Sequence, residues 1–491
     1  MTTSVLILDC GATNVKACLM DTAGTIIASH SLPNETMPDP NCSGGLIWDI
    51  DDIWNKLATC SRKVCSMAGS TRIMGVTVTT FGVDGAAMKK DGTSCYPVIS
   101  WQCSRTQSVE QNISKYFDPE ELYRITGLQS YHFNTIHKLI WLKENKPDVL
   151  ESMDYYVLLP SLLLYLLSAE FVTDTTMAGT TMLTDISKRH FSDEIMNRLE
   201  ISSGIFPELV EPGTIIGRVT AAAAEAMGIP AGIAVVAAGH DTQFAVLASG
   251  AGVNQPVLSS GTWDILMVRA QAASLRLPPK QSGVTIELDT LPGLVNPAVQ
   301  WVASGILEWI IRMYYTDLAG DSRYGTLIRE ATIVPPGCQG LTMIPELFQG
   351  GFSGKPGSFT GFTNETTRAH FYRAGLEALS CYLAYGLDML QQVGNYTARE
   401  MICVGGGSKN KLWNQIRADV LGIPVKALDM KETTALGAAL VAFTGMGIYK
   451  SIEEAFSAVE SSYEISEPGE NRERYREVYG LFVERVFNKG K

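Results

Sequence analysis

The chain has 491 residues, 46% of them hydrophobic and 18% charged, which predicts two or more domains with large cores and argues against long disordered segments. Its 39 Lys and Arg residues against 51 Asp and Glu residues give a formal net charge of −12 at pH 7. An acidic chain without basic runs argues against nucleic acid and anionic membranes as partners, so an anionic ligand would need a local binding site.

The ten cysteines are scattered along the chain and form no CxxC pair. We therefore expect reduced thiols in a cytoplasmic protein, rather than a disulfide framework or a zinc site. The N-terminus has no basic region and reaches Asp9 too early for a signal peptide. The longest apolar stretch, residues 155–167, is broken by Pro160 and is too short to span a bilayer.

The N-terminal stretch predicts three antiparallel strands joined by hairpins, over residues 5–8, 15–20 and 25–29. The first hairpin turn consists of small residues, whose exposed N–H groups can hold phosphate oxygens. Asp9 lies at the mouth of this turn, where a carboxylate can hold a hydrated Mg²⁺. An ordinary hairpin with a polar tip is the alternative. The candidate phosphate contacts are Gly11, Thr13, Asn14 and Lys16.

The rest of the first half alternates strands with helices. We expect strands over 73–81, 96–101 and 235–238, and helices over 49–67, 118–127, 134–144, 161–168 and 244–249. Residues 249–252 are the expected domain hinge. Residues 256–269 then repeat the opening arrangement of strand, Gly-Thr turn and strand, which favours a duplicated two-domain architecture.

The second half has fewer predicted elements. We expect helices over 367–393, 411–421 and 434–444, and strands over 401–404 and 425–428. The charged tail from about Tyr463 is expected to be a surface helix.

Phosphoryl transfer requires positioned phosphates, neutralised charge and a base for the attacking hydroxyl. Asp241 is the candidate base, because it follows a predicted strand and would open into a cleft. Its alternative role is the N-cap of the helix that follows. Gly261 and Thr262 form a second turn that could hold phosphates from the other side.

A glycine-rich turn lies between the predicted strand 401–404 and the helix that follows it. Its candidate ligand contacts are Gly405, Gly406, Gly407 and Asn410, since glycine lets a ligand approach the backbone closely. The competing interpretation is a dinucleotide fingerprint. GxGxxG starting at Gly405 would need a glycine where Asn410 stands, so this interpretation fails in detail.

Several polar or aromatic residues follow strand ends in the first half, as a polyol site requires. Taken singly, each has a structural alternative: a turn for Asp84, a core position for Trp101 and a solvated surface for Arg105. The candidate substrate contacts are Asp84, Trp101, Arg105, His240 and Gln243.

These motifs together resemble the FGGY family of carbohydrate kinases, in the family's order and over about residues 4 to 450. They are Asp9-Cys-Gly-Ala-Thr-Asn14, Thr79-Thr-Phe-Gly-Val-Asp-Gly85, Gly239-His-Asp-Thr-Gln243, Ser259-Ser-Gly-Thr-Trp263, Arg368-Ala-His-Phe-Tyr-Arg-Ala374 and Val404-Gly-Gly-Gly-Ser-Lys-Asn410. The first turn departs from the family's frequent Gly-Thr-Thr or Gly-Thr-Ser, because Ala12 lacks a hydroxyl.

The resemblance implies an α/β fold of two actin-like (ribonuclease H-like) ATPase domains with a central cleft, over residues 1–248 and 249–462. It offers no motif for the tail over residues 463–491, which we expect to be helical from its charged sequence alone. It implies ATP and Mg²⁺ as cofactors, and phosphorylation of the C1 hydroxyl of L-fuculose, with L-rhamnulose or D-xylulose as alternative ketoses. It makes Asp241 the base and Asp9 the Mg²⁺ partner. Thr13, Lys16, Gly261 and Thr262 would contact phosphates. Gly405, Gly406 and Asn410 would line the adenosine pocket, and the five substrate candidates would face the sugar.

Two other classes of function stay open. One is an actin-like, ATP-switched scaffold or sugar sensor that transfers no phosphate, and the other is an oxidoreductase with nicotinamide bound at Gly405. A pure switch needs no base at the position of Asp241, which favours the kinase. The sequence does not determine the oligomeric state, and a homodimer is one assembly that it allows.

Overall fold

A computed structural model describes residues 2–69, 71–318, 320, 323–347, 356–430 and 432–487. Contacts divide the chain into two compact units. Unit 1 contains residues 1–250, 286–295 and 432–460, and unit 2 contains residues 251–285, 296–431 and 461–491. The predicted domain boundary at 248/249 and the hinge at 249–252 stay predictions. The contacts add that two later segments, 286–295 and 432–460, return to unit 1.

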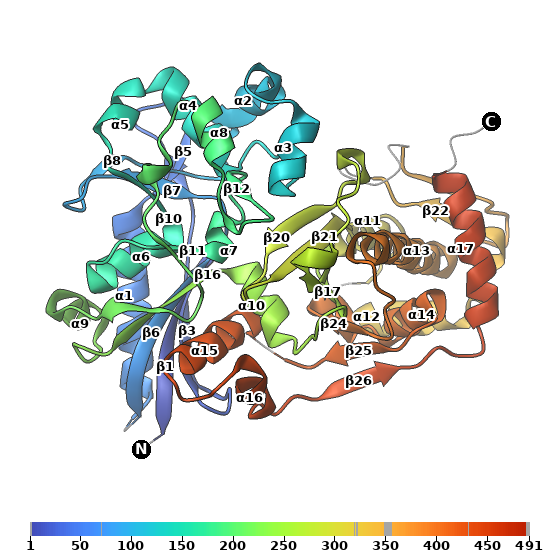
Figure 1. The fold of residues 1–491 in the computed structure, drawn as a ribbon. Coiled ribbons are helices and arrows are strands. Elements are labelled where there is room, and N and C mark those ends of the chain that lie inside the picture. Colours follow the sequence, from blue (N-terminus) through green and yellow to red (C-terminus); the bar gives the residue numbers. More distant parts are fainter. Residues whose placement is uncertain are drawn as a thin grey trace. The chain divides into compact units, whose positions relative to one another are not determined.

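Unit 1 is built on a six-stranded sheet with the order β15-β16-β6-β1-β2-β3. Strands β1, β3, β6 and β16 of this sheet are labelled in Figure 1. Neighbouring strands of β1–β2–β3 are antiparallel, which confirms the predicted N-terminal hairpins. In contrast, β1 is parallel to β6 and β6 is parallel to β16, so these three strands end at one edge of the sheet. The strands are β1 (Thr3–Cys10), β2 (Asn14–Asp21), β3 (Ile26–Pro33), β6 (Arg72–Thr80), β15 (Ile215–Arg218) and β16 (Ala234–His240).

Helices cover both faces of this sheet. Because side chains alternate along a strand, Leu6 and Leu8 of β1 join the core beneath α1 and α6, whereas the equally buried Val5 and Ile7 face α15. The helices of unit 1 that cover the sheet or extend from it are α1 (Ile50–Met67), α6 (Leu159–Ser168), α9 (Ala221–Met227), α10 (Asp241–Ala248), α15 (Thr433–Gly445) and α16 (Ile452–Ser457).

A second core within unit 1 lies among shorter elements of residues 85–206. The predicted strand 96–101 is wrong as a single element, because it is split into β8 and β9 at Pro97, which cannot donate a ladder hydrogen bond. The shorter elements of unit 1 are β4 (Met37–Pro38), β5 (Leu46–Trp48), β7 (Gly85–Met88), β8 (Ser94–Tyr96), β9 (Val98–Ile99), α2 (Gln107–Gln111), α3 (Pro119–Thr126), α4 (Thr135–Asn145), α5 (Pro147–Ser152), β10 (Tyr155–Leu158), β11 (Thr173–Asp174), α7 (Thr175–Ala178), β12 (Thr184–Asp185), β13 (His190–Phe191), α8 (Asp193–Arg198) and β14 (Leu209–Val210).

Unit 2 has its own sheet, with the order β19-β21-β18-β17-β24-β25-β26 and with β20 paired to β21. The strands of this sheet are β17 (Pro256–Ser260), β18 (Trp263–Val268), β19 (Ala270–Gln271), β20 (Thr285–Leu288), β21 (Leu294–Val302), β24 (Met401–Val404), β25 (Val425–Leu428) and β26 (Tyr463–Ser466), and a separate pair is β22 (Thr342–Ile344) with β23 (Ser358–Thr360). Within it, most of β20 and the first two residues of β21 belong to the segment 286–295 of unit 1. Its helices are α11 (Ser304–Tyr314), α12 (Arg323–Ile333), α13 (Arg368–Gly394), α14 (Lys411–Leu421) and α17 (Arg472–Val486).

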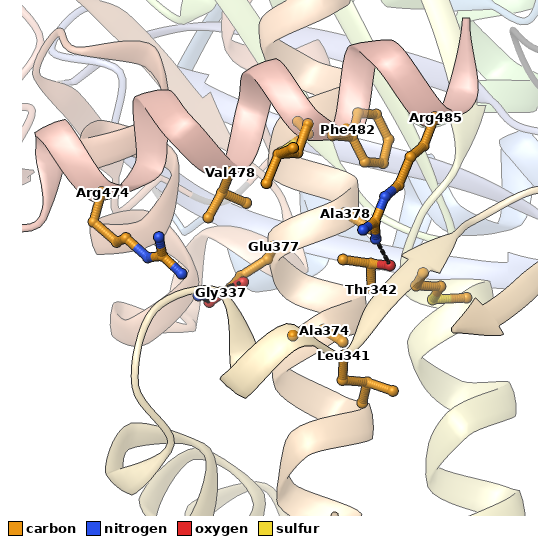
Figure 2. A pocket seen from close by; sticks show the side chains of 14 residues that line it. Gly337, Leu341, Thr342, Ala374, Glu377, Ala378, Arg474, Val478, Phe482 and Arg485 are labelled. Atoms are coloured by element: carbon orange, nitrogen blue, oxygen red, sulfur yellow. Dashed lines mark hydrogen bonds between the residues drawn. The ribbon is translucent and has the colours of Figure 1, made fainter. Parts of the chain in front are cut away.

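The C-terminal tail differs from the expected surface helix at its start. Residues 463–466 form β26, which pairs antiparallel with the edge of β25 and so satisfies backbone groups that a helix there would leave unpaired. Helix α17 follows and buries Tyr475, Phe482 and Val486. Together with α13 it encloses a mostly apolar cavity, at whose rim Arg485 donates a hydrogen bond of 2.6 Å to Thr342 Oγ1 (Figure 2).

Two global expectations can be compared with the structure. All ten cysteines are free thiols, as the sequence predicted. None of the helices in the described part of the chain is both long enough and apolar enough to cross a membrane.

We predict that the contact between α10 and α15 depends on Gly437. A Cβ atom at this position would lie 2.1 Å from the carbonyl oxygen of Phe244. Gly437→Ala should therefore separate the two helices and lower stability by about 1–3 kcal/mol. Gly480→Ala is the matched control, because no atom lies within 4 Å of its Cβ position on the exposed side of α17. That change should stabilise its helix by about 0.5–1 kcal/mol. Thermal unfolding midpoints test the pair, and a Gly437→Ala midpoint at or above the unmodified protein would contradict the prediction.

Candidate active site

The parallel strands of unit 1 place several candidate residues at one edge of the sheet. Asp9 of β1 is level with Thr79 of β6, and Thr79 is in turn level with Gly239 of β16. Asp241 follows β16 directly as the first residue of α10. Two carboxylates that are distant in the sequence therefore come from the same end of this sheet.

Gly239 is required for the bend between β16 and α10. Its φ of +153° lies in a region that L side chains rarely adopt, and a Cβ atom there would lie 2.0 Å from Asp174 Oδ1. The β16–β6 register is also irregular between Val236 and Gly239, and such bulges redirect the residues that follow.

The first hairpin turn is held from outside by Asn34, a residue that the sequence analysis missed. The Asn34 side chain donates to Gly11 O at 2.9 Å, and its backbone N–H donates to Thr13 O at 2.8 Å. Within the turn, Gly11 N donates to Asn14 O at 2.9 Å, while the side chains of Thr13 and Asn14 are exposed. The turn is thus held in shape with both polar side chains directed to solvent.

Lys16 and Asp9 face each other across the β1–β2 pair. The Lys16 ammonium forms an ion pair of 2.5 Å with Glu432, which the sequence analysis did not single out. Burial, together with the nearby Asp241 carboxylate, raises the pKa of Asp9 to about 7, while Lys16 opposes both effects. Asp9 therefore lies in an anionic, poorly hydrated setting in which a cation would be favourable.

Asp241 does not act as the cap of α10. His240 occupies the N-cap position, and the Asp241 Oδ1 atom instead accepts from Thr242 N at 2.6 Å and from Thr242 Oγ1 at 3.2 Å. Burial raises the pKa of Asp241, while the His240 cation and the Thr242 hydrogen bonds lower it. Among the described residues, Asp241 Oδ2 has no hydrogen-bond partner, so one oxygen is available to take a proton.

His240 and Gln243 share one unexpected partner, Glu287. The Glu287 Oε2 atom lies 3.1 Å from His240 Nδ1 and accepts from Gln243 Nε2 at 2.5 Å. On the other side of the ring, His240 Nε2 lies 3.5 Å from Asp241 Oδ1. Although burial lowers the pKa of His240, the Glu287 and Asp241 carboxylates raise it to about 9.

Asp84 is fully buried and its carboxylate is completely engaged by the protein. One oxygen forms an ion pair with Lys138, and the other accepts from Trp48 Nε1 at 2.7 Å and from Trp101 N at 3.0 Å. The pair is desolvated, which raises the pKa of Asp84 and lowers that of Lys138, each against the attraction of its partner. Direct contact between Asp84 and a sugar stays a prediction. In this structure, the Asp84 carboxylate accepts a hydrogen bond from Trp101 N and so helps to position that residue.

The residue before Asp84 is strained. Val83 has φ of +69°, which is rare for a β-branched residue. Its N–H donates to Thr180 Oγ1 at 3.0 Å, and its carbonyl accepts from Thr135 Oγ1 at 2.8 Å and from Lys138 Nζ at 3.0 Å. Backbone strain persists only where the surroundings overdetermine it, so this turn at the end of β6 is rigidly held.

Trp101 and Arg105 have different surroundings. Trp101 is half-buried, its ring packs edge-on against Phe133, and its indole N–H is buried without a partner among the described residues. Arg105 is not a solvated surface residue, since its side chain is only 4% exposed and pairs with Asp39 at 2.7 Å. Its guanidinium also lies over the Trp141 ring. A sugar contact by Arg105 stays a prediction, although its charge is already neutralised by Asp39.

The two glycine turns of unit 2 lie next to each other, because β17 is parallel to β24 with Ser259 level with Val404. Gly405 has φ of +89°, and a Cβ atom there would lie 2.6 Å from Ser260 O. A Cβ atom on Gly407 would lie 2.1 Å from Ser260 Oγ. These two glycines are therefore needed for packing on β17, whereas Gly406 has no atom near its Cβ position and is open to a ligand.

The remaining candidates in unit 2, Gly261, Thr262 and Asn410, each accept a hydrogen bond from the protein. Gly261 and Thr262 receive backbone hydrogen bonds on their carbonyl oxygens from Ser304 N and Ala303 N. Asn410 is the N-cap of α14, with its side chain accepting from Trp413 N at 3.1 Å. Arg417, which no sequence motif marks, is fully buried and donates to Ser260 Oγ at 2.7 Å beneath these turns.

The missed residues share one property, which is that no motif contains them. Asn34, Lys138 and Arg417 lie within ordinary loops or helices, and each acts on a motif residue distant in the sequence. For Lys138 and Arg417 one signal was available, which is a basic residue at a core-facing position of a helix, because Lys and Arg are rarely buried unless they are paired.

Comparisons with known proteins identify the family of the chain. Models of the N-terminal and C-terminal domains of the FGGY family of carbohydrate kinases match residues 4–248 and 257–446. L-fuculokinase of Escherichia coli K12 is 44% identical over 96% of this chain and 99% of its own length. L-fuculokinase of Haemophilus influenzae is 41% identical over 93% and 97%.

Solved structures agree on the fold. The xylulose kinase of Rhodospirillum rubrum superposes with a TM-score of 0.88 at 24% identity, covering 98% of this chain and 97% of that one. This confirms the predicted mixed α/β fold of two domains. The chain belongs to the FGGY family of carbohydrate kinases.

Proposed function

We propose that this carbohydrate kinase transfers the terminal phosphoryl group of ATP to the O1 hydroxyl of L-fuculose. The observation that carries the proposal is the 44% identity to a curated L-fuculokinase over 96% of the chain. L-Rhamnulose and D-xylulose are the alternative acceptors. A cytoplasmic location is proposed with it, supported by the ten free thiols. A homodimer stays a prediction.

In the proposed reaction, Asp241 is the general base. Its Oδ2 atom takes the proton of the sugar hydroxyl as that oxygen attacks the phosphorus, and a positioned base typically contributes about 10²–10⁴ in rate. His240, at 3.5 Å from the base, favours the ionised form of the buried carboxylate. His240, Gln243 and Trp101 are the proposed sugar contacts, and Trp101 supplies an aromatic face and an unpartnered N–H.

Nucleotide contacts are proposed for each unit by itself. Gly11, Thr13, Asn14 and Lys16 would hold phosphates in unit 1, with Lys16 exchanging its Glu432 partner for a phosphate oxygen. In unit 2, Gly261 and Thr262 would hold phosphates, and the open Gly406 together with Gly405, Gly407 and Asn410 would line the adenosine site.

Mg²⁺ fits the donor set of unit 1. Among the described residues there is no group of three or more His, Cys, Asp or Glu side chains able to hold a metal, so a protein cage for a metal is not formed. Mg²⁺ typically needs only one or two carboxylates, with water and substrate phosphates completing its shell. Asp9 supplies such a carboxylate in a site crowded with negative charge. When bound, the ion would neutralise phosphate charge.

The substrate assignment is tested with a panel of ketoses. We expect the purified protein to release ADP fastest with L-fuculose, compared with L-rhamnulose and D-xylulose, in a coupled assay. Asp241→Asn should reduce this turnover by about 10²–10⁴ because the base is lost, while nucleotide affinity measured by titration stays unchanged. Faster turnover of another ketose would overturn the substrate, and unchanged turnover in the variant would remove Asp241 from the mechanism.

The proposed metal role predicts a change in Mg²⁺ dependence. Asp9→Asn keeps the size of the side chain but removes the charge, so we expect the free Mg²⁺ concentration for half-maximal activity to rise about tenfold or more. The assay varies free Mg²⁺ at fixed ATP and ketose concentrations. An unchanged Mg²⁺ dependence would assign the metal contact to another group.

The Asp84–Lys138 pair predicts a loss of stability. Asp84→Asn leaves a buried ammonium without its carboxylate, which should cost about 3–5 kcal/mol. Adding Lys138→Met should recover part of that loss, because no buried charge remains. Thermal unfolding of the single and double variants measures both effects. If Asp84 instead acts by direct sugar contact alone, the single variant will unfold like the unmodified protein and only its KM for the ketose will rise.

A further inference from the structure

A segment from the second half of the chain returns to unit 1 and brings Glu287 to the candidate base. This segment, residues 286–295, is anchored at both ends. Ile286 N donates to Gly127 O at 2.8 Å, and Leu288 packs against Gly179, whose Cβ position lies 3.1 Å from it. Glu287 lies between these two anchored residues, so its backbone is fixed.

Arg189 fixes the far part of the same segment. Its guanidinium donates to the carbonyl oxygens of Asp289 at 2.6 Å and Leu294 at 3.4 Å. The guanidinium is itself held by both carboxylate oxygens of Glu211, at 2.9 and 2.8 Å. A bidentate pair of this kind defines orientation as well as distance. The segment is thus tied to unit 1 by side chains that have no part in the candidate site.

Glu287 contacts two of the proposed sugar contacts with a single oxygen. Its Oε2 atom lies 3.1 Å from His240 Nδ1 and 2.5 Å from Gln243 Nε2, and the side chain is 18% exposed. With Nδ1 on the side of the Glu287 carboxylate, the other ring nitrogen of His240, Nε2, lies 3.5 Å from Asp241 Oδ1. A Cβ atom on Gly82 would lie 3.3 Å from that nitrogen, so the glycine keeps this side of the ring uncrowded.

We propose that Glu287 is a positioning residue that orients His240 and Gln243 toward the acceptor sugar, and thereby sets the affinity of the enzyme for its ketose. The inference rests on the proposed ketose phosphorylation. A histidine ring has two distinct nitrogens, and the partner of one determines where the other points. Without Glu287, the ring can rotate and Gln243 loses an anionic acceptor, so both contacts would have to be ordered again by the sugar.

A purely structural role predicts something different. If Glu287 only held the segment 286–295 in place, its loss would lower stability and weaken ketose and nucleotide binding together. The segment 286–295 is, however, already held in place by Arg189 and by its own backbone hydrogen bonds. A selective change in the KM for the ketose therefore separates positioning from folding.

The test uses the full-length protein and three single variants. Glu287→Ala removes the acceptor, and Glu287→Gln keeps its shape and one acceptor oxygen but removes the charge. Glu225→Ala is the control, since Glu225 is an exposed carboxylate on α9. Initial rates are measured with L-fuculose varied at saturating ATP and with ATP varied at saturating L-fuculose. Thermal unfolding is recorded for every variant.

We expect Glu287→Ala to raise the KM for L-fuculose about tenfold or more, with the KM for ATP changed less than about twofold. Glu287→Gln should recover part of the loss. In a Gln243→Ala background, Glu287→Ala should have a smaller effect, because one of its two partners is already absent. The control should match the unmodified enzyme.

Two results would overturn this inference while leaving the proposed function intact. One is a KM for L-fuculose that is unchanged in Glu287→Ala. The other is an equal increase in the KM values for L-fuculose and for ATP, together with a lowered unfolding midpoint. An unmodified enzyme that phosphorylates none of the three ketoses overturns the proposed function and this inference with it. An enzyme that prefers another ketose leaves the inference intact, and the same KM comparison is then made with that sugar.

Discussion

The parallel pairing of β1, β6 and β16 is the constraint on which the site in unit 1 depends. Parallel strands end at the same edge, so Asp9, the Gly82–Asp84 turn and the His240–Asp241 pair meet although they are separated by many residues in the chain. Antiparallel pairing of any one of these strands would send its terminal residue to the opposite edge. The glycine at 239 then allows the chain to turn against Asp174, which places Asp241 at the start of α10.

That edge concentrates negative charge in a poorly hydrated place, and the structure supplies cations to balance it. Burial and mutual repulsion raise the pKa of Asp9 to about 7, and Lys16, His240 and Lys138 lie against the carboxylates that would otherwise take up protons. Each of these cations comes from a different element. An ionised Asp241 and the binding of a further cation would both depend on this balance, because an isolated charge in such surroundings is neutralised by a shift in its pKa.

Much of the fold was predictable from local patterns, since the hairpins of the N-terminus, the helix over residues 50–67 and the helix over residues 368–394 follow directly from hydrophobic periodicity. The motif residues Asp9 and Asp241 were found because strand ends and small residues mark them. Glu287 and Lys138 were not predictable, because their roles arise from tertiary contacts with residues far away in the sequence. The glycines at 405 and 407 were found, but their conformational freedom is used to pack against Ser260.

The weak repeat noticed in the sequence corresponds to a full repeat in topology. The sheet of unit 1 runs β15-β16-β6-β1-β2-β3, and six strands of unit 2 run β26-β25-β24-β17-β18-β21. Corresponding neighbours also agree in direction: the hairpins β1–β2 and β17–β18 are antiparallel, and β1–β6 and β17–β24 are parallel. The same edge therefore carries different chemistry in each unit, acids and a histidine in unit 1 and glycines with hydroxyls in unit 2. A shared pairing pattern constrains strand direction and leaves the residues after each strand free to differ, so the two units can share one backbone arrangement while the repeat is nearly invisible in the sequence.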